Sequence, residues 1–420
     1  MVPKGWKRVA IKEVCESIID CVNKTAPVVD YETPFKMIRT TNVRNGRVNT
    51  EDVRFVTEDT YLQWIRRGKP KVGDIIFTRE APVGEAGVLQ DAEGVFLGQR
   101  TMMYRADNRL SDNYFLFYSL LSPFCQKQIE DFSNGGTVAH MRVPDCGEIL
   151  VNLPPLVEQK KIAKILSTWE KAISVTEKLL ANSQQQKKSL MQQLLTGKKR
   201  LLDESGVRFS GEWSTVSLEH ICNINPRRPP EPSDGIVSFI SMDLVSEDAK
   251  ILNTVEKQYS DVSTGFTSFI DDDVLIAKIT PCFENGKGAY VQGMMNGIGF
   301  GSTEFHVLRA NQKANPKFIY YLTNTTEFRI RGEANMQGSA GQKRVTTDYL
   351  KALIVSLPST IEEQQKIADV LSAADAEIST LEKKLACLKD EKKALMQQLL
   401  TGKRRVSVPV KVEEKEAVSA

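Results

Sequence analysis

One short string in the chain has the residue types of a metal-dependent nuclease. Pro144-Asp145 is followed by Glu158-Gln159-Lys160, which fits a loose Pro-Asp…Glu-x-Lys pattern whose carboxylates hold Mg²⁺ beside a lysine. Glu158, however, comes directly after a Pro-Pro step and is expected to begin a long helix. A self-contained Mg²⁺-dependent nuclease is therefore kept as an alternative function and not as the main hypothesis.

Other residues that could do chemistry do not occur at useful spacings. No histidine pairs with a second histidine or a cysteine as metal ligands do, and the seven cysteines include no Cys-x-x-Cys pair. The Gly-Lys steps lack the rest of a phosphate-binding loop. Asn225-Pro226-Arg227 departs at its third position from the Asn-Pro-Pro-aromatic motif of DNA-amino methylation. The sequence thus predicts no catalytic site, no metal and no cofactor.

The composition suits a folded protein of about two to three domains, since 420 residues can bury sizeable cores. Lys and Arg number 56 against 53 Asp and Glu, a mildly basic balance that permits nucleic-acid binding without requiring it. The first residues contain no apolar segment of a signal peptide, and no stretch approaches ~18 consecutive apolar residues. We expect a soluble, cytoplasmic protein with reduced cysteines.

The strongest feature of the chain is an internal repeat. Residues 187–198 (KKSLMQQLLTGK) return as residues 392–403 (KKALMQQLLTGK), an offset of 205 residues (392 − 187). Over Glu158–Leu201 against Glu363–Val406, 25 of 44 positions are identical without a gap. This period is domain-sized and exceeds the roughly 20–50 residues of solenoid repeats. The chain is therefore predicted to be a duplicated module, which suits a target or partner that also comes in two halves.

The regions before the repeated segments are related more weakly. Trp6 and Trp213 each open an alternating apolar pattern that predicts a short strand. Residues 73–77 resemble residues 272–276, each ahead of a proline (Pro82 and Pro281), and Arg142-Val143 aligns with Arg344-Val345. The intervening residues differ, which suggests one fold serving two different ligands.

Both weakly related regions are rich in Val, Ile, Phe, Thr and Gly, with frequent turn signals. The best helix candidates in them are Asn113–Gln126 and Pro316–Phe328. Each region is therefore predicted to be a mixed α/β domain built on a largely antiparallel sheet.

The repeated segments themselves predict long helices. Apolar residues recur at steps of three and four positions over four heptads, from Ile162 to Leu194 and from Ile367 to Leu399, which is typical of coiled coils. Gly197 and Gly402 provide the glycine expected after a helix end. Each helix should contain ~40 residues and span about 60 Å. Two independent helices, each packed on its own domain, remain the alternative.

The expected fold class is therefore α+β. Two mixed α/β domains in tandem are each followed by a long helix, and the two helices are expected to pack as an antiparallel coiled coil with pseudo-two-fold symmetry.

The repeated strings resemble those of one protein family. Leu153–Leu166 (LPPLVEQKKIAKIL), its partner at 357–371 and the two LMQQLLTGK blocks look like the conserved helical regions of specificity (S) subunits of type I restriction–modification enzymes. Ser210–Trp213 is similar to that family's opening of a second target-recognition domain. The resemblance covers the whole chain, in the order recognition domain, helix, recognition domain, helix.

The resemblance implies a DNA sequence-specificity subunit without chemistry of its own. Each recognition domain would bind one half of a bipartite double-stranded DNA site. Two methyltransferase (M) subunits would dock on the helices, and restriction/translocase (R) subunits would join the full complex. Helices of about 60 Å are long enough to set the spacer between half-sites, since DNA repeats every ~34 Å. A coiled-coil scaffold that binds no DNA is the second alternative.

On this basis the chain has five expected segments. They are a first target-recognition domain (1–152), a first conserved helix (153–201), a second target-recognition domain (202–356), a second conserved helix (357–405) and a disordered tail (406–420).

Base reading requires Arg, Lys, Asn or Gln at a groove edge, with phosphate contacts from other polar groups. In the first domain the candidates are Arg39, Thr40, Thr41, Asn42, Arg44, Arg79, Gln99, Arg100, Asn134, Thr137, His140 and Arg142. In the second domain they are Arg227, Arg228, Lys278, Thr280, Ser302, Thr303, Gln337, Gln342, Lys343 and Arg344.

The ends of the two helices offer apolar and methionine surface for a partner. The candidates are Leu190, Met191, Leu194, Leu195, Leu395, Met396, Leu399 and Leu400. That these residues only close the coiled coil is the alternative.

Overall fold

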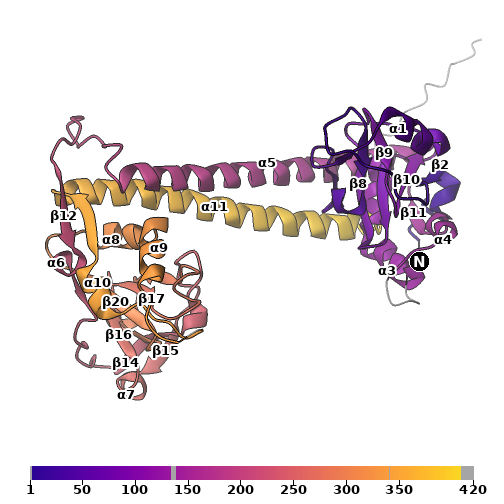
Figure 1. Ribbon diagram of the computed structural model, residues 1–420. Helices are drawn as coiled ribbons and strands as arrows, with labels where there is room; N and C mark the ends of the chain where they lie inside the picture. The colour runs from indigo at the N-terminus through magenta and orange to yellow at the C-terminus, as the bar shows by residue number, and fades with distance from the viewer. Residues whose placement is uncertain (1, 134–138, 340, 408–420) are drawn as a thin grey trace, which may run out of the picture. The chain divides into compact units, whose positions relative to one another are not determined.

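The computed structural model describes residues 2–133, 139–339 and 341–407. The chain divides into unit 1, Met1–Glu177 with Lys383–Ala420, and unit 2, Lys178–Glu382. Each unit therefore contains one globular lobe and one half of each long helix (Figure 1). We call residues 2–153 the first lobe and residues 201–358 the second lobe. Asn134, Thr137 and the expected tail from residue 408 onward lie outside the described residues.

The first lobe is built on a four-stranded antiparallel sheet in the order β2-β10-β7-β8. A second sheet, β6-β3-β9, contains the parallel pair β3–β9, and β1–β11 and β4–β5 are antiparallel pairs. The strands are β1 (Lys7–Ala10), β2 (Cys15–Asp20), β3 (Lys36–Ile38), β4 (Val43–Arg44), β5 (Arg47–Val48), β6 (Arg54–Phe55), β7 (Ile75–Arg79), β8 (Val83–Val88), β9 (Val95–Leu97), β10 (Thr101–Ala106) and β11 (Leu150–Leu153). The helices are η1 (Ile11–Val14), η2 (Thr40–Asn42), α1 (Glu58–Trp64), η3 (Ile65–Arg67), α2 (Asn113–Leu120), α3 (Pro123–Ser133) and α4 (Val143–Gly147).

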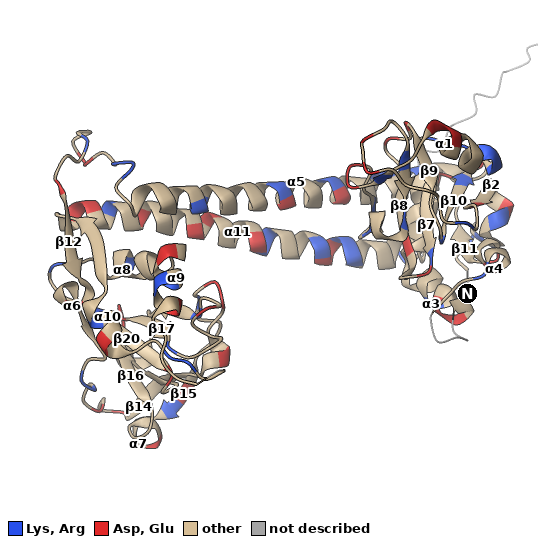
Figure 2. Ribbon diagram, viewed as in Figure 1, with Lys and Arg blue, Asp and Glu red and all other residues tan. Residues whose placement is uncertain are grey.

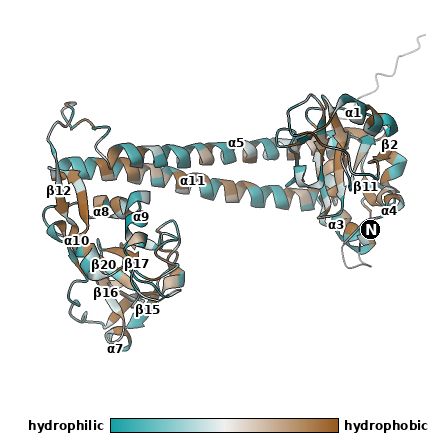
Figure 3. Ribbon diagram, in the orientation of Figure 1, coloured by the Kyte–Doolittle hydropathy of each residue, from teal (hydrophilic) through white to brown (hydrophobic). Residues whose placement is uncertain are grey.

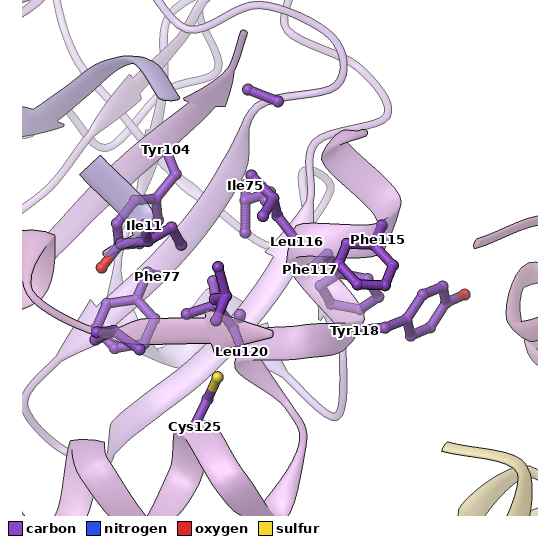
Figure 4. Close-up of a cluster of buried hydrophobic side chains, with 14 of the residues drawn as sticks. Ile11, Ile75, Phe77, Tyr104, Phe115, Leu116, Phe117, Tyr118, Leu120 and Cys125 are labelled. Atoms are coloured by element: carbon purple, nitrogen blue, oxygen red, sulfur yellow. The ribbon is translucent and has the colours of Figure 1, made fainter. Parts of the chain in front are cut away.

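The core of the first lobe forms between its main sheet and α2. Phe115 and Leu116 of α2 are fully buried in one cluster with Ile75 and Phe77 of β7 (Figure 4). Burying such side chains is worth about 1.5–3 kcal/mol each, which offsets the entropy of ordering the short strands. The same cluster includes residues of both long helices, so the helix pair is part of the lobe's core.

The second lobe repeats this plan. Its main antiparallel sheet has the order β13-β20-β17-β18, and its second sheet, β15-β14-β19-β16, contains the parallel pair β14–β19. The strands are β12 (Trp213–Ser217), β13 (Cys222–Ile224), β14 (Ile236–Ile240), β15 (Val255–Gln258), β16 (Thr267–Ile270), β17 (Val274–Ala277), β18 (Gly288–Tyr290), β19 (Ile298–Gly301), β20 (Phe305–Ala310) and β21 (Ile354–Pro358). The helices are α6 (Leu218–Ile221), η4 (Met242–Leu244), α7 (Tyr259–Val262), η5 (Met295–Gly297), α8 (Pro316–Thr323), α9 (Thr326–Ala334) and α10 (Thr347–Ala352). The prediction of mixed α/β domains on largely antiparallel sheets is confirmed.

The expected helices at Asn113–Gln126 and Pro316–Phe328 are each broken into two. Pro123 begins α3 because proline suits a first helical turn, where its missing N–H is not needed. In the second lobe the Thr325 hydroxyl accepts a hydrogen bond from the Phe328 N–H (3.2 Å) and caps a new helix, α9. The periodicity predicted helices correctly but gave no signal of these breaks.

The long helices are α5 (Leu156–Leu194) and α11 (Ile361–Leu399), each 39 residues or about 58 Å. Hydrophobic and hydrophilic residues alternate along both (Figure 3). Gly197 and Gly402 follow their ends with a φ of 69°, a left-handed conformation that glycine adopts without strain. No helix in the described part of the chain is long and apolar enough to span a membrane.

Candidate nucleic-acid interface

In the first lobe, backbone hydrogen bonds bring several strand ends together. The Arg79 N–H at the end of β7 donates to the Arg100 carbonyl (2.8 Å), and the Met141 N–H donates to the Arg79 carbonyl (3.0 Å). The Gly98 N–H donates to the Ile38 carbonyl (2.7 Å), which joins the ends of β9 and β3. These contacts gather on one edge the predicted residues Arg39, Arg79, Gln99, Arg100, His140 and Arg142.

Arg100 is the most prominent of the gathered side chains. It has a φ of 68°, and its side chain is 55% exposed and paired with Glu80 (2.5 Å). Gln99 beside it is exposed, as are Thr41, His140 and Arg142, while Thr40 is half-buried. Exposed amide and guanidinium groups of this kind can donate to base edges or phosphates.

Other candidates in the first lobe use their polar groups inside the protein. Asn42 is buried, accepts from the Arg39 N–H (3.0 Å) and donates to the Asp52 carbonyl (2.6 Å). Arg79 is 6% exposed and pairs with Asp20 (3.0 Å). Arg44 donates to the Ala81 carbonyl (3.2 Å), next to Pro82. These three residues therefore shape the edge, whereas exposed neighbours are free to touch a ligand.

The second lobe has an equivalent edge at the end of β17. The Lys278 N–H donates to the Glu304 carbonyl (2.9 Å), and the Val345 N–H donates to the Lys278 carbonyl (2.9 Å). The Thr280 N–H donates to the Lys343 carbonyl (3.0 Å). This edge gathers the predicted residues Lys278, Thr280, Ser302, Thr303, Gln337, Gln342, Lys343 and Arg344. Of these, Thr303, Gln337, Gln342 and Lys343 are exposed.

Arg344 lies against Glu304 on this edge, with Nη2 3.0 Å from Oε1. This guanidinium lowers the pKa of the Glu304 carboxyl. The pair fixes the loop before α10, so Arg344 orders the edge as Arg79 does in the first lobe.

His306 of β20 is a positioning residue that sequence reasoning missed. It is 3% exposed, its Nε2 donates to the Val345 carbonyl (2.8 Å), and its Nδ1 lies 3.1 Å from Asn225 Nδ2. Burial lowers the pKa of His306, so the ring is held neutral. Asn225 in turn accepts from the Val307 N–H (3.0 Å), and the exposed Arg227 and Arg228 follow it. An isolated histidine in an alternating strand carried no signal of this role.

The two edges also correct one sequence alignment. Met141 and Val345 make the same backbone hydrogen bond, to Arg79 and Lys278 respectively, so they are structural equivalents. The match of Arg142-Val143 with Arg344-Val345 is therefore two residues out of register. It was wrong because a shared Arg-Val dipeptide is too short to fix an alignment.

The nuclease-like string is not assembled into a metal site. Glu158 is buried and accepts from Arg405 (2.7 and 2.8 Å) and from Trp6 Nε1 (3.1 Å). Asp145 pairs instead with Arg142 (2.7 Å). Within the described ranges, no group of three His, Cys, Asp or Glu side chains could hold a metal ion.

A groove lies beside the end of each long helix. In unit 2 it measures about 780 Å³ and is lined by Lys188, Met191 and Gln192 of α5 together with the α8–α9 junction. In unit 1 it measures about 650 Å³ and is lined by Lys393, Met396 and Gln397 of α11 together with the α2–α3 junction. The offset of 205 residues relates the two helical triplets, while the rest of the two linings differs.

The eight predicted partner-binding residues divide into two groups. Leu194, Leu195, Leu399 and Leu400 are buried in the cores of their units. Leu190, Met191, Leu395 and Met396 are half-buried, and both methionines face the grooves.

Comparison with known proteins agrees with the sequence strings and the fold. A family model for the type I restriction modification DNA specificity domain matches residues 3–182 and again residues 210–389. The chain is 37% identical to the type I restriction enzyme EcoAI specificity subunit of Escherichia coli, over 39% of this chain and only 28% of that relative. It is 24% identical to the putative MjaX specificity subunit of Methanocaldococcus jannaschii, over 96% of this chain and 95% of that relative.

The fold is also known from a solved structure. The S subunit of a type I restriction–modification system from M. genitalium is similar with a TM-score of 0.60 at 14% identity, covering 97% of each chain. The resemblance to type I specificity subunits is thereby confirmed. The chain belongs to the type I restriction modification DNA specificity domain family, whose model it matches twice.

Proposed function

We propose that this chain selects a bipartite DNA site for a type I restriction–modification complex, with one lobe reading each half-site. The observation that carries the proposal is the duplicated edge. Equivalent strand ends present different side chains, Gln99 and Arg100 in the first lobe and Thr303 and Glu304 in the second. A constant framework with variable polar groups suits two half-sites of different sequence, because base edges are distinguished by their donor and acceptor pattern.

The exposed and buried candidates would have different roles on DNA. Gln99, Arg100, Gln337 and Gln342 are the proposed base readers, since amide and guanidinium groups can donate to purine edges. Arg142, Arg227, Arg228 and Lys343 are proposed phosphate contacts, which fix register on the duplex. Asn42, Arg79 and Arg344 would hold the edge in shape.

We propose further that α5 and α11 form an antiparallel coiled coil with pseudo-two-fold symmetry and set the spacer between half-sites. We call the positions at alternating steps of four and three residues, from Ile162 to Leu194 and from Ile367 to Leu399, the helix seam. Every one of these positions is buried or half-buried, which supports this packing. Within unit 1 the start of α5 shares a core with the end of α11, and within unit 2 the start of α11 shares a core with the end of α5. Residues 1–152 and 202–356 would then be the two target-recognition domains.

The two grooves, which share a repeated helical triplet, are the proposed docking sites for two methyltransferase subunits. Each offers a methionine between a lysine and a glutamine, an adaptable apolar patch with a polar rim. Restriction/translocase subunits would join the same complex on chromosomal DNA in the cytoplasm.

Genome-wide mapping of adenine methylation tests the proposed function. Cells that contain the cognate methyltransferase are compared with and without this chain. A two-part motif that disappears on deletion of the chain supports the proposal and names both half-sites. An unchanged methylome, with the chain and methyltransferase both shown to be expressed, contradicts it and favours the scaffold alternative.

A further inference from the structure

In unit 2, a polar junction joins the second lobe to both long helices. Lys187 Nζ of α5 lies 2.5 Å from Asp375 Oδ1 of α11 and 5.8 Å from the centre of the Tyr321 ring in α8. The Tyr321 hydroxyl donates to Asp375 Oδ2 (2.7 Å) and lies 3.2 Å from Ser372 Oγ. One lysine therefore contacts a carboxylate of the opposite helix and an aromatic ring of the lobe.

Unit 1 contains the same junction with the helices exchanged. Lys392 of α11 pairs with Glu170 of α5 and lies 5.6 Å from the centre of the Tyr118 ring in α2. The Tyr118 hydroxyl donates to Ser167 Oγ (3.2 Å). The offset of 205 residues carries Lys187 onto Lys392, Ser167 onto Ser372 and Glu170 onto Asp375. The junction is thus a repeated feature of the fold.

Both lysines are largely withdrawn from solvent. Their side chains are 23% and 17% exposed, and those of the paired carboxylates are 24% and 25% exposed. Both are half-buried and lie on the mainly apolar stripe of their helix, whereas other charged residues are spread along α5 and α11 (Figure 2). A buried ion pair gains little stability because desolvation offsets the attraction, yet one lysine in a seam selects a single alignment.

We propose that Lys187 and Lys392 fix the orientation of each lobe on the helix pair and so act as positioning residues for spacer recognition. This inference rests on the proposed function. If a lobe tilts, the ammonium group must leave either the carboxylate or the ring. The shared apolar cores hold each lobe on the helices, but apolar contacts are non-directional. The exposed contacts of Arg47 with Glu177 and of Lys250 with Glu382 add little to the choice of orientation.

The consequence for DNA follows from helix geometry. Changing a spacer by one base pair moves a half-site by about 3.4 Å and turns it by about 35° around the duplex. A lobe held at one orientation tolerates neither change, whereas a lobe free to tilt tolerates both. Loss of the lysine should therefore broaden the set of accepted spacers.

The test uses the full chain assembled with its cognate methyltransferase. Methylation rates are measured on duplexes that carry the mapped motif with its native spacer or with one base pair removed or added. We expect the unmodified complex to favour the native spacer about tenfold, equivalent to ~1.4 kcal/mol, and Lys187→Met or Lys392→Met to reduce this preference to about threefold or less. Melting temperatures should fall moderately, because each substitution leaves the paired carboxylate, Asp375 or Glu170, without its lysine. Lys127→Met, which removes an exposed lysine from α3, is the matched control and should leave the preference unchanged.

Three further results decide the inference. An unaltered spacer preference in the folded methionine variants overturns it. Lys187→Arg should keep the preference, because the charge and the ring contact are retained. If Lys187→Met does not fold, Lys187→Met with Asp375→Leu removes the unpaired charge, and failure of that variant too would assign the junction to stability alone and overturn the inference. No spacer preference in the unmodified complex would instead contradict the proposed function.

Discussion

Arg405 holds Glu158 through two hydrogen bonds, 2.7 Å from Nε to Oε1 and 2.8 Å from Nη2 to Oε2. Glu158 lies in the first turn of α5, and Arg405 follows the end of α11, so the pair joins residues 247 positions apart within unit 1. Unit 2 has the same arrangement between Arg200 and Glu363, at 2.5 and 2.6 Å. The carboxylate that resembled a nuclease residue in the sequence is therefore a structural link at the start of each long helix.

Removing Arg405 should destabilise unit 1. Among the described residues, Arg405→Ala leaves the buried Glu158 carboxylate with the Trp6 N–H alone as a partner, which we expect to cost about 2 kcal/mol. Denaturant unfolding of the full chain measures this loss. Arg404→Ala removes an exposed neighbouring guanidinium and is the control. Equal effects of the two substitutions would mean that the link to Glu158 contributes nothing specific.

Replacing Arg100 should change sequence recognition in one half-site. If Arg100 reads a base, Arg100→Ala weakens binding by about 1–3 kcal/mol and relaxes one position of the motif. The measurement is the methylation motif together with binding to duplexes altered at each position of the half-sites. A uniform loss across all sequences would assign Arg100 to a phosphate.

Charging the grooves should release the methyltransferase. Met191→Glu and Met396→Glu place a carboxylate in surfaces that we propose a partner covers, while the buried leucines beside them keep the fold intact. Co-purification with the methyltransferase should drop at least about tenfold for each variant, a loss of ~1.4 kcal/mol. Gln193→Glu and Gln398→Glu change exposed residues two positions after the methionines. These control variants should have no effect. Undiminished co-purification of the methionine variants would move the docking site elsewhere.

Lowering the pH should destabilise the second lobe through His306. Its pKa is lowered by burial, so below its ordinary value of 6.5 the unfolded chain binds a proton that the folded chain does not. Protonation would also set an Nδ1–H against the amide group of Asn225. The melting temperature should therefore fall between pH 7.5 and pH 5.5 by more in the unmodified chain than in His306→Gln. Parallel pH dependences in both chains would show that His306 is not the titrating group.

The elements with strong periodicity could be predicted from the sequence. The apolar positions from Ile162 to Leu194 predicted the long helix α5 and where it ends, because a narrow apolar stripe is a local property of the chain. The opening strands β1 and β12 were found in the same way. The breaks at Pro123 and Thr325 were missed because a single capping residue can override continuous helical periodicity.

The candidate site was only partly accessible to sequence reasoning. Residue type selected Arg79, Asn42 and Arg100 as equal candidates. Only the fold shows that Arg79 pairs with Asp20 and that Asn42 donates to the Asp52 carbonyl, so neither is exposed as Arg100 is. Lys187 illustrates the same limit. It is a half-buried residue whose partners Asp375 and Tyr321 are 188 and 134 residues away in the chain. Long-range polar pairing has no periodic signature.

Lengthening both helices together should lengthen the DNA spacer. Seven residues, one heptad, inserted after Glu177 and again after Glu382 preserve the seam and add about 10.5 Å at 1.5 Å per residue. At about 3.4 Å per base pair this predicts a methylation motif with about three more spacer base pairs. If the heptad is inserted in α5 alone, it has no matching residues in α11 to pack against, and modification should be abolished. A matched double insertion that methylates the original spacer would disprove the role of the helices as the spacer-setting element, because the half-sites would then be positioned by contacts that do not depend on helix length.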